Sequence, residues 1–108
     1  MSQDNLNLII KAIKKILDPK KIILFGSYSR GENTKDSDLD LAVLQKETPK
    51  VGEIANVLTY LYRSKYNWDV SPDIHLFSEK NFNQRLNNNS LFIREIVKGK
   101  TIYEIKIY

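Results

Sequence analysis

The stretch GSYSRGENTKDSDLD, residues 26–40, decides how this chain is organised. It follows a hydrophobic run, KIILF (21–25), and leads into a second one, LAVL (41–44). A glycine–serine pair ends the first run, and two aspartates one residue apart precede the second. Short β-branched apolar runs bounded by turn residues are typical of buried strands. We therefore expect two strands joined by a polar segment, with two carboxylates where the second strand begins.

Apolar residues also recur at helical spacing on both sides of this pair of strands. Between residues 6 and 17 they repeat every three or four positions, which predicts a helix with one buried stripe. Proline disfavours the α conformation in the residue before it, so Asp18–Pro19 should end this helix. The other expected helices are one that starts at Thr48–Pro49 and fades near Asn67, a short piece that opens at Ser78–Glu79, and residues 91–97 between NNNS and Gly99.

Two further segments are candidate strands. VSPDIHLFS (70–78) predicts a third strand, and Pro72, which lacks an N–H, belongs at its beginning or at a sheet edge. TIYEIKIY (101–108) alternates weakly and is either a final strand or a packing tail. This order of elements predicts an α/β (α+β) fold in which a small mixed β-sheet is flanked by helices.

The composition limits the possible classes of protein. With 108 residues, 42% hydrophobic and 28% charged, residues 1–108 are expected to form a single soluble domain. No apolar run approaches the roughly 20 residues of a membrane span, and the N-terminus lacks the basic segment of a signal peptide. The chain has no cysteine and a single histidine, which excludes disulfides and sites built from several histidines. We expect a cytoplasmic protein without a membrane partner.

The chain is moderately basic, with a net charge of +4. Its lysines are scattered over helix faces and turns, and no run of five basic residues occurs. A basic excess alone is weak evidence for a polyanionic partner, so nucleic-acid binding is not favoured.

Asp38 and Asp40 are the first candidate site. Residues two apart in a strand point to the same face, so the two carboxylates should project side by side. Neighbouring carboxylates repel each other unless a cation lies between them. Mg²⁺ prefers oxygen ligands, often one or two carboxylates together with phosphate oxygens and water. This pair therefore predicts a platform for a divalent metal ion.

Gly26 and Ser27 are the second candidate site. Glycine at a strand end allows a ligand to approach the backbone closely. If Ser27 caps a short helix over SYSRGE, the free N–H groups of that helix suit a phosphate group. Arg30 and Lys35 can neutralise further phosphate charge. A lone Gly-Ser or a lone Asp-x-Asp is more often structural, but their combination in this order favours phosphoryl chemistry.

The pattern of Gly-Ser, ten residues and then Asp-x-Asp resembles the signature of the DNA polymerase β-like nucleotidyltransferases. FGSYSRGE followed by SDLDLAVL is similar to the stand-alone minimal nucleotidyltransferase (MNT) domains. The resemblance implies that Gly26 and Ser27 bind the triphosphate and that Asp38 and Asp40 bind metal, most often two Mg²⁺ ions. Arg30 and Gly31 match the Arg-Gly pair of the family, with Arg30 either touching phosphate or holding the loop through Asp36 or Glu32.

The family also has a third carboxylate, which binds metal and acts as the base for the attacking hydroxyl. Asp73 in SPDIHLF matches it best, although Pro72 replaces a residue that is often hydrophobic in the family. Asp69 is the alternative, but it lies nearer the loop after the preceding helix. His75 is two residues from Asp73 and either lines the site or is an ordinary surface group.

This resemblance implies an enzyme that binds ATP and transfers AMP to a hydroxyl group. Many MNT proteins pair with a helical HEPN toxin, and the implied activity is that of an antitoxin that adds AMP to a tyrosine of the toxin. The alternative is an interaction module that neutralises its partner by binding, with weak or absent catalysis. Transfer to RNA or to a small molecule is not favoured, because relatives with such substrates usually carry extra domains.

Overall fold

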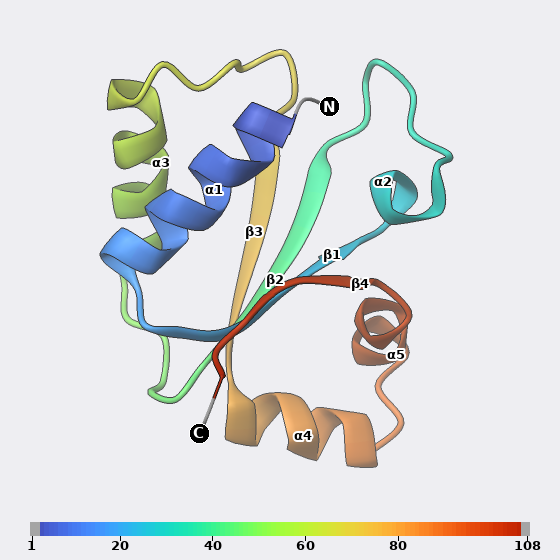
Figure 1. Cartoon of the computed structure of the whole chain (residues 1–108). Helices are drawn as coiled ribbons and strands as arrows, with labels where there is room; N and C mark the ends of the chain where they lie inside the picture. Colours follow the sequence, from blue (N-terminus) through green and yellow to red (C-terminus); the bar gives the residue numbers. More distant parts are fainter. Residues whose placement is uncertain (1–2, 107–108) are drawn as a thin grey trace.

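A sheet of four strands lies between two layers of helices in the computed structural model, which describes residues 3–106 (Figure 1). The chain runs through α1 (Gln3–Ile16), β1 (Pro19–Phe25), α2 (Ser27–Arg30), β2 (Leu39–Gln45), α3 (Glu53–Arg63), β3 (Pro72–Ser78), α4 (Glu79–Asn87), α5 (Leu91–Val97) and β4 (Lys100–Glu104). The prediction of a small mixed sheet flanked by helices is confirmed.

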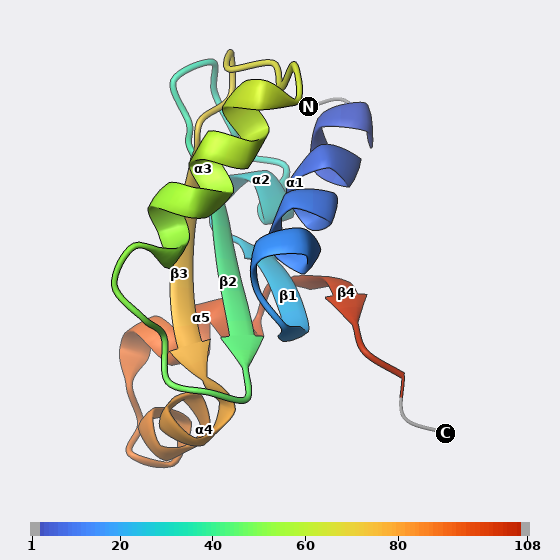
Figure 2. The same cartoon turned by 90° about the vertical axis from the view of Figure 1, so that its left-hand side faces the viewer.

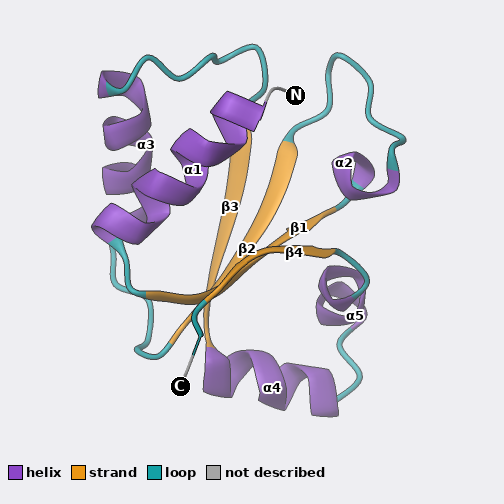
Figure 3. Cartoon of the chain, in the orientation of Figure 1, coloured by secondary structure: helices purple, strands orange, loops and turns teal. Residues whose placement is uncertain are grey.

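The strands lie in the order β3-β2-β1-β4 (Figure 3). β1 is antiparallel to both β2 and β4, whereas β2 and β3 are parallel. The parallel pair is connected by α3, the kind of helical crossover that parallel strands require (Figure 2). As a result, the end of β1 and the beginnings of β2 and β3 meet at one end of the sheet, and β3 is an edge strand.

Strands β1, β2 and β3 each bury side chains on both of their faces. From β1, Ile22 and Leu24 pack with α1 and α3, whereas Ile23 and Phe25 pack with α4 and α5. Burial on both faces explains why the β1 and β2 sequences are continuously apolar rather than alternating. The even-numbered residues of β2 from Asp40 onward therefore face the α4 and α5 layer.

The predicted start of the third helix is wrong. α3 begins at Glu53, because Gly52 has a φ of 90° and cannot belong to a right-handed helix. Val51, which lies inside the predicted helix, instead precedes α3 and is fully exposed. The helix also ends at Arg63, before the predicted limit near Asn67.

Other boundaries agree with their local signals. Pro72 is the first residue of edge strand β3, as its missing N–H predicted. The hydroxyls of Ser78 and Ser90 accept hydrogen bonds from Asn81 N and Ile93 N and cap α4 and α5. The C-terminal segment forms β4 over Lys100–Glu104 on the free side of β1, and residues 107–108 of the predicted strand lie outside the described residues.

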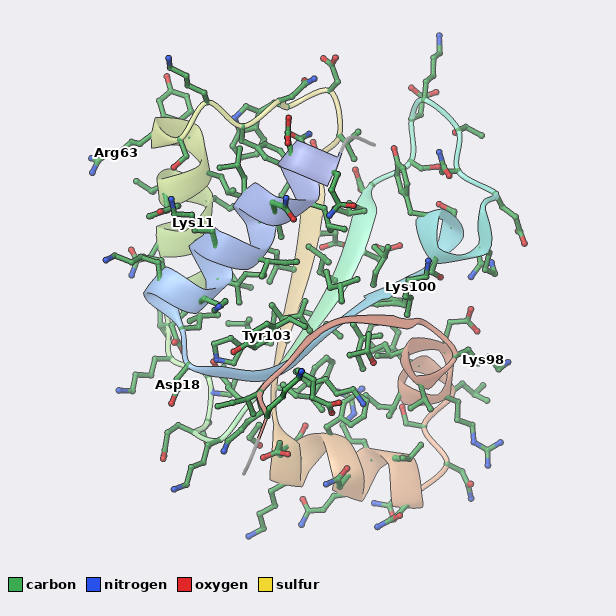
Figure 4. All side chains as sticks on the ribbon, viewed as in Figure 1. Lys11, Asp18, Arg63, Lys98, Lys100 and Tyr103 are labelled. Atoms are coloured by element: carbon green, nitrogen blue, oxygen red, sulfur yellow. The ribbon has the colours of Figure 1, made fainter. Side chains whose placement is uncertain are left out.

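Basic side chains lie on more than one side of the molecule. Lys11 and Arg63 project from α1 and α3, and Lys98 lies on the opposite side of the molecule (Figure 4). The positive charge is thus spread over more than one face, in line with the expectation from the sequence.

Among residues 3–106, every helix is too short or too polar to span a membrane.

Candidate functional site

Asp40 and Asp73 face each other across the two parallel strands. Asp40 is the second residue of β2, and the register pairs it directly with Asp73 of β3. Both side chains point to the α4 and α5 side of the sheet, the side on which Phe77 is buried four residues further along β3. The sheet therefore brings together two carboxylates that are 33 residues apart in the chain.

Asp40 is in an environment that disfavours its charged form. Burial is the largest cause that raises the pKa of Asp40, and the charge of Asp73 raises it further. The imidazole of His75 lowers this pKa, and the charge of Asp38 adds the weakest of the raising effects. A cation would be stabilised beside a carboxylate whose pKa is raised by burial and by a neighbouring carboxylate.

His75 completes the group on the same face of β3. Its Nε2 lies 3.2 Å from Asp73 Oδ2, within hydrogen-bonding distance. The imidazole ring also contacts two phenyl rings, with centroid distances of 5.7 Å to Phe25 and 5.3 Å to Phe92. These rings, one from β1 and one from α5, hold the imidazole beside the carboxylate. The sequence left two possibilities for His75, a residue that lines the site or an ordinary surface group. Its contact with Asp73 shows that it lines the candidate site.

The chemistry of this group fits a divalent metal ion. Asp40, Asp73 and His75 can each offer one ligand atom, and these atoms lie within 4.8 Å of one another. Carboxylate oxygens suit Mg²⁺ and Mn²⁺, and an imidazole nitrogen suits Mn²⁺ and other transition metals. Burial and the charge of Asp73 raise the pKa of Asp40, so a bound cation would stabilise the charged form of this carboxyl.

Gly26 brings the end of β1 against this site. Its backbone has φ 75° and ψ −158°, a conformation that is essentially restricted to glycine. A Cβ atom added at this position would overlap Asp40 Oδ2. The absence of a side chain at residue 26 thus allows the carboxylate of Asp40 to lie directly against the backbone of the glycine–serine pair.

The predicted capping role of Ser27 is wrong. Gly26 occupies the N-cap position and Ser27 is the first residue of the short helix α2. Within residues 3–106 no side chain caps α2, and the Ser29 hydroxyl instead donates a hydrogen bond to Gly26 O at 2.8 Å. The Ser27 hydroxyl has no hydrogen-bond partner among residues 3–106, so it is available to a ligand.

The other predicted carboxylates lie farther out. Asp38 precedes β2 by one residue, has an exposed side chain and is not part of the closely spaced group of Asp40, Asp73 and His75. Asp69 lies in the loop before β3, where its backbone N–H donates to Asn67 Oδ1. Between Asp69 and Asp73, only Asp73 is paired in register with Asp40.

Arg30 is held by carboxylates. Its guanidinium lies 2.9 Å from Glu95 Oε1 and 3.4 Å from Glu32 Oε1, and it is half-exposed. The expected contact with Glu32 is present, whereas Glu95 of α5 could not be foreseen because it is 65 residues away.

Ser37 stabilises the loop before β2, since its Oγ accepts a hydrogen bond from Thr34 N at 2.9 Å. Sequence reasoning also missed Phe25 and Phe92, although the position of Phe25 directly before Gly26 was a usable signal.

Comparison with known protein families gives one match that covers nearly the whole chain. The family model described as polymerase beta, nucleotidyltransferase matches residues 7–107. This range includes the glycine–serine pair and all of the candidate carboxylates.

The names of the curated relatives describe protein adenylyltransferases. A candidate protein adenylyltransferase of Methanocaldococcus jannaschii is 40% identical over 75 residues, which cover 62% of this chain and 76% of the relative. The protein adenylyltransferase MntA of Shewanella oneidensis is 45% identical over 49 residues, which cover 44% of this chain and 35% of MntA.

Solved structures with a similar fold come from toxin–antitoxin complexes. A chain in a crystal structure of a toxin–antitoxin complex with AMP-PNP has a TM-score of 0.62 and 27% identity, covering 93% of this chain and 73% of that one. A chain in the structure of a tri-AMPylated Shewanella oneidensis HEPN toxin with an MNT antitoxin has a TM-score of 0.58 and 23% identity, covering 97% and 74%. The second likeness concerns the fold alone.

Proposed function

Because this chain belongs to the polymerase beta nucleotidyltransferase family, we propose that it transfers AMP from Mg-ATP to a tyrosine of a helical HEPN-type partner protein and thereby acts as an antitoxin. One observation carries the proposal: the register pairs Asp40 with Asp73 beside the side-chain-free backbone of Gly26. The names of the curated relatives and the complex with AMP-PNP support the choice of adenylyl transfer. A cytoplasmic location remains a prediction.

The site residues form two groups, one that binds metal and one that binds the triphosphate. Asp38, Asp40 and Asp73 hold the metal, for which we propose two Mg²⁺ ions. Gly26 and Ser27 bind the triphosphate through the backbone and the Ser27 hydroxyl. When bound, the divalent ions supply positive charge that offsets the charge of the carboxylates and the phosphate oxygens.

Arg30 belongs to the phosphate-binding group as well. Its guanidinium is half-exposed and contacts two carboxylates that are themselves exposed, Glu32 and Glu95. Exposed ion pairs contribute only about 0–1 kcal/mol to stability. Arg30 can therefore leave one of these carboxylates and contact a phosphate at little cost in free energy.

The reaction is an in-line displacement at the α-phosphorus of ATP. The tyrosine oxygen forms a new bond to this phosphorus while the bond to the bridging oxygen of the β-phosphate breaks, and pyrophosphate leaves. The Asp73 carboxylate accepts the phenol proton, and His75 fixes the orientation of this carboxylate through its Nε2 contact.

The test is transfer of labelled AMP to the partner protein by the wild-type chain and by the Asp38→Asn and Asp40→Asn variants. We expect labelling of one tyrosine by the wild type, loss of labelling in both variants, and retained binding of the partner. If no nucleotide and no divalent ion supports transfer while the partner is still neutralised, the chain is a binding module and the enzymatic proposal is wrong.

A further inference from the structure

A groove of about 580 Å³ runs along β3 away from the carboxylates. Residues 74–77 of β3 line its floor, and one wall comes from the β2–α3 loop and the first turn of α3. Arg85 of α4 and Phe92 of α5 line the other side. His75 belongs both to this groove and to the site, because its Nε2 contacts Asp73. The groove therefore opens directly beside the proposed base.

The edge of β3 is free along this groove. Among the described residues, β3 pairs only with β2, so one row of its backbone N–H and C=O groups faces away from the sheet. An unpaired edge of this kind can accept an extended peptide as an additional strand. A polypeptide is the polymer whose hydrogen-bonding groups match it.

The groove combines exposed apolar side chains with positive charge. Val51 is 107% exposed, and Ile54 and Phe92 are 37% and 39% exposed, although all three are apolar. Lys50 and Arg85 also line the groove, and no carboxylate from residues 3–106 does. A fitting partner segment therefore carries apolar side chains for the groove and acidic residues beside them.

The order of the strands sets the direction from which the acceptor arrives. Gly26 ends β1, Asp40 lies on the central strand β2, and Asp73 lies on β3. In an in-line displacement the attacking and leaving oxygens lie on opposite sides of the phosphorus. With the triphosphate held at Gly26, pyrophosphate leaves toward β1 and the acceptor enters from the β3 edge, where the groove lies.

We propose that this groove docks the acceptor-bearing segment of the partner protein. The segment lies extended along the edge of β3, inserts apolar side chains against Val51 and Phe92, and places acidic residues near Lys50 and Arg85. Its hydroxyl then lies next to Asp73. This inference rests on the proposed function and adds to it the surface and the chemistry by which the acceptor is recognised.

The test measures AMP transfer to the purified acceptor protein by Val51→Glu and Lys50→Glu variants. The matched control is Tyr62→Glu, which changes a residue of α3 that is 78% exposed and does not line the groove. We expect each groove variant to raise the KM for the acceptor about ten-fold, the typical effect of removing one anchoring contact. The KM for Mg-ATP stays unchanged in all three variants.

A photo-cross-linking amino acid at position 51 gives a second readout. We expect it to trap the same protein that becomes labelled, through a segment adjoining the modified tyrosine, whereas position 62 traps nothing. Unchanged acceptor KM in both groove variants, or cross-links from position 62 alone, would overturn the docking inference. Labelling of RNA instead of protein would also overturn it. Absence of any transfer by the wild-type chain counts against the proposed function and is thereby distinguished from failure of the docking inference.

Discussion

Substitution of Gly26 by alanine tests the contact between the end of β1 and the carboxylate site. The backbone at this position has φ 75° and ψ −158°, and an added Cβ would overlap Asp40 Oδ2. Two separate effects are therefore expected, a backbone strain and a displacement of the Asp40 side chain. The first acts on stability, and the second acts mainly on catalysis.

The magnitude follows from these two effects. Holding a non-glycine residue in a sparsely populated backbone region costs about 1–3 kcal/mol. Asp40 can relieve the overlap by rotating its carboxylate, at about 0.5–1.5 kcal/mol for an off-rotamer side chain. We expect Gly26→Ala to lower the free energy of unfolding by about 2–4 kcal/mol in total. Displacement of a catalytic group by about 1 Å costs roughly 100-fold in rate, so AMP transfer should fall by at least that factor.

Urea unfolding and labelled AMP transfer measure the two effects, and two comparisons separate them. Gly31→Ala also has a positive φ, 69°, but nothing lies within 4 Å of its added Cβ. It should cost about 1–2 kcal/mol of stability and leave the transfer rate intact. In an Asp40→Ala background, the stability cost of Gly26→Ala should shrink by about 1 kcal/mol, because the displaced carboxylate is absent.

Equal transfer rates in the Gly26→Ala and Gly31→Ala proteins would refute the reasoning, since they would mean that Gly26 does not position Asp40. Strict additivity of Gly26→Ala and Asp40→Ala in the unfolding experiment would refute the predicted overlap.

Three further experiments test the site and the core. Burial and the charge of Asp73 raise the pKa of Asp40 above 3.8, so the metal-free folded protein binds a proton there more tightly than the unfolded chain does. Its stability should therefore fall as pH rises from 3.8 through this raised pKa, and Asp40→Asn or added Mg²⁺ should remove the loss, as urea unfolding at several pH values will show. Asp73→Asn should abolish AMP transfer while Asp69→Asn leaves the rate unchanged, and the opposite result would make Asp69 the third carboxylate. Leu61→Ala should lower the free energy of unfolding by about 2–5 kcal/mol, because Leu61 of α3 is fully buried in the hydrophobic cluster that includes Ile13 of α1. Tyr62→Ala on the exposed side of the same helix should change this free energy by about 0.5 kcal/mol or less.

Most of the fold was predictable because its signals are local. Helical spacing over residues 6–17, the apolar runs of β1 and β2, and the serine caps of α4 and α5 each depend on a few neighbouring residues. Two of the errors arose at glycines, because a glycine can adopt backbone conformations that the sequence pattern does not reveal. Gly52 at positive φ delayed the start of α3, and Gly26 rather than Ser27 became the N-cap of α2.

By itself, the sequence determined the chemistry of this protein: the glycine–serine pair, the aspartates and the strands that carry them. Only the tertiary structure decided which groups meet, since the parallel register of β2 and β3 pairs Asp40 with Asp73 and leaves Asp69 in a loop. The structure likewise brought Glu95 to Arg30 and both phenyl rings to His75. The physical reason is that register is set by packing between distant segments, and a slip of one residue would turn Asp73 to the other face of the sheet.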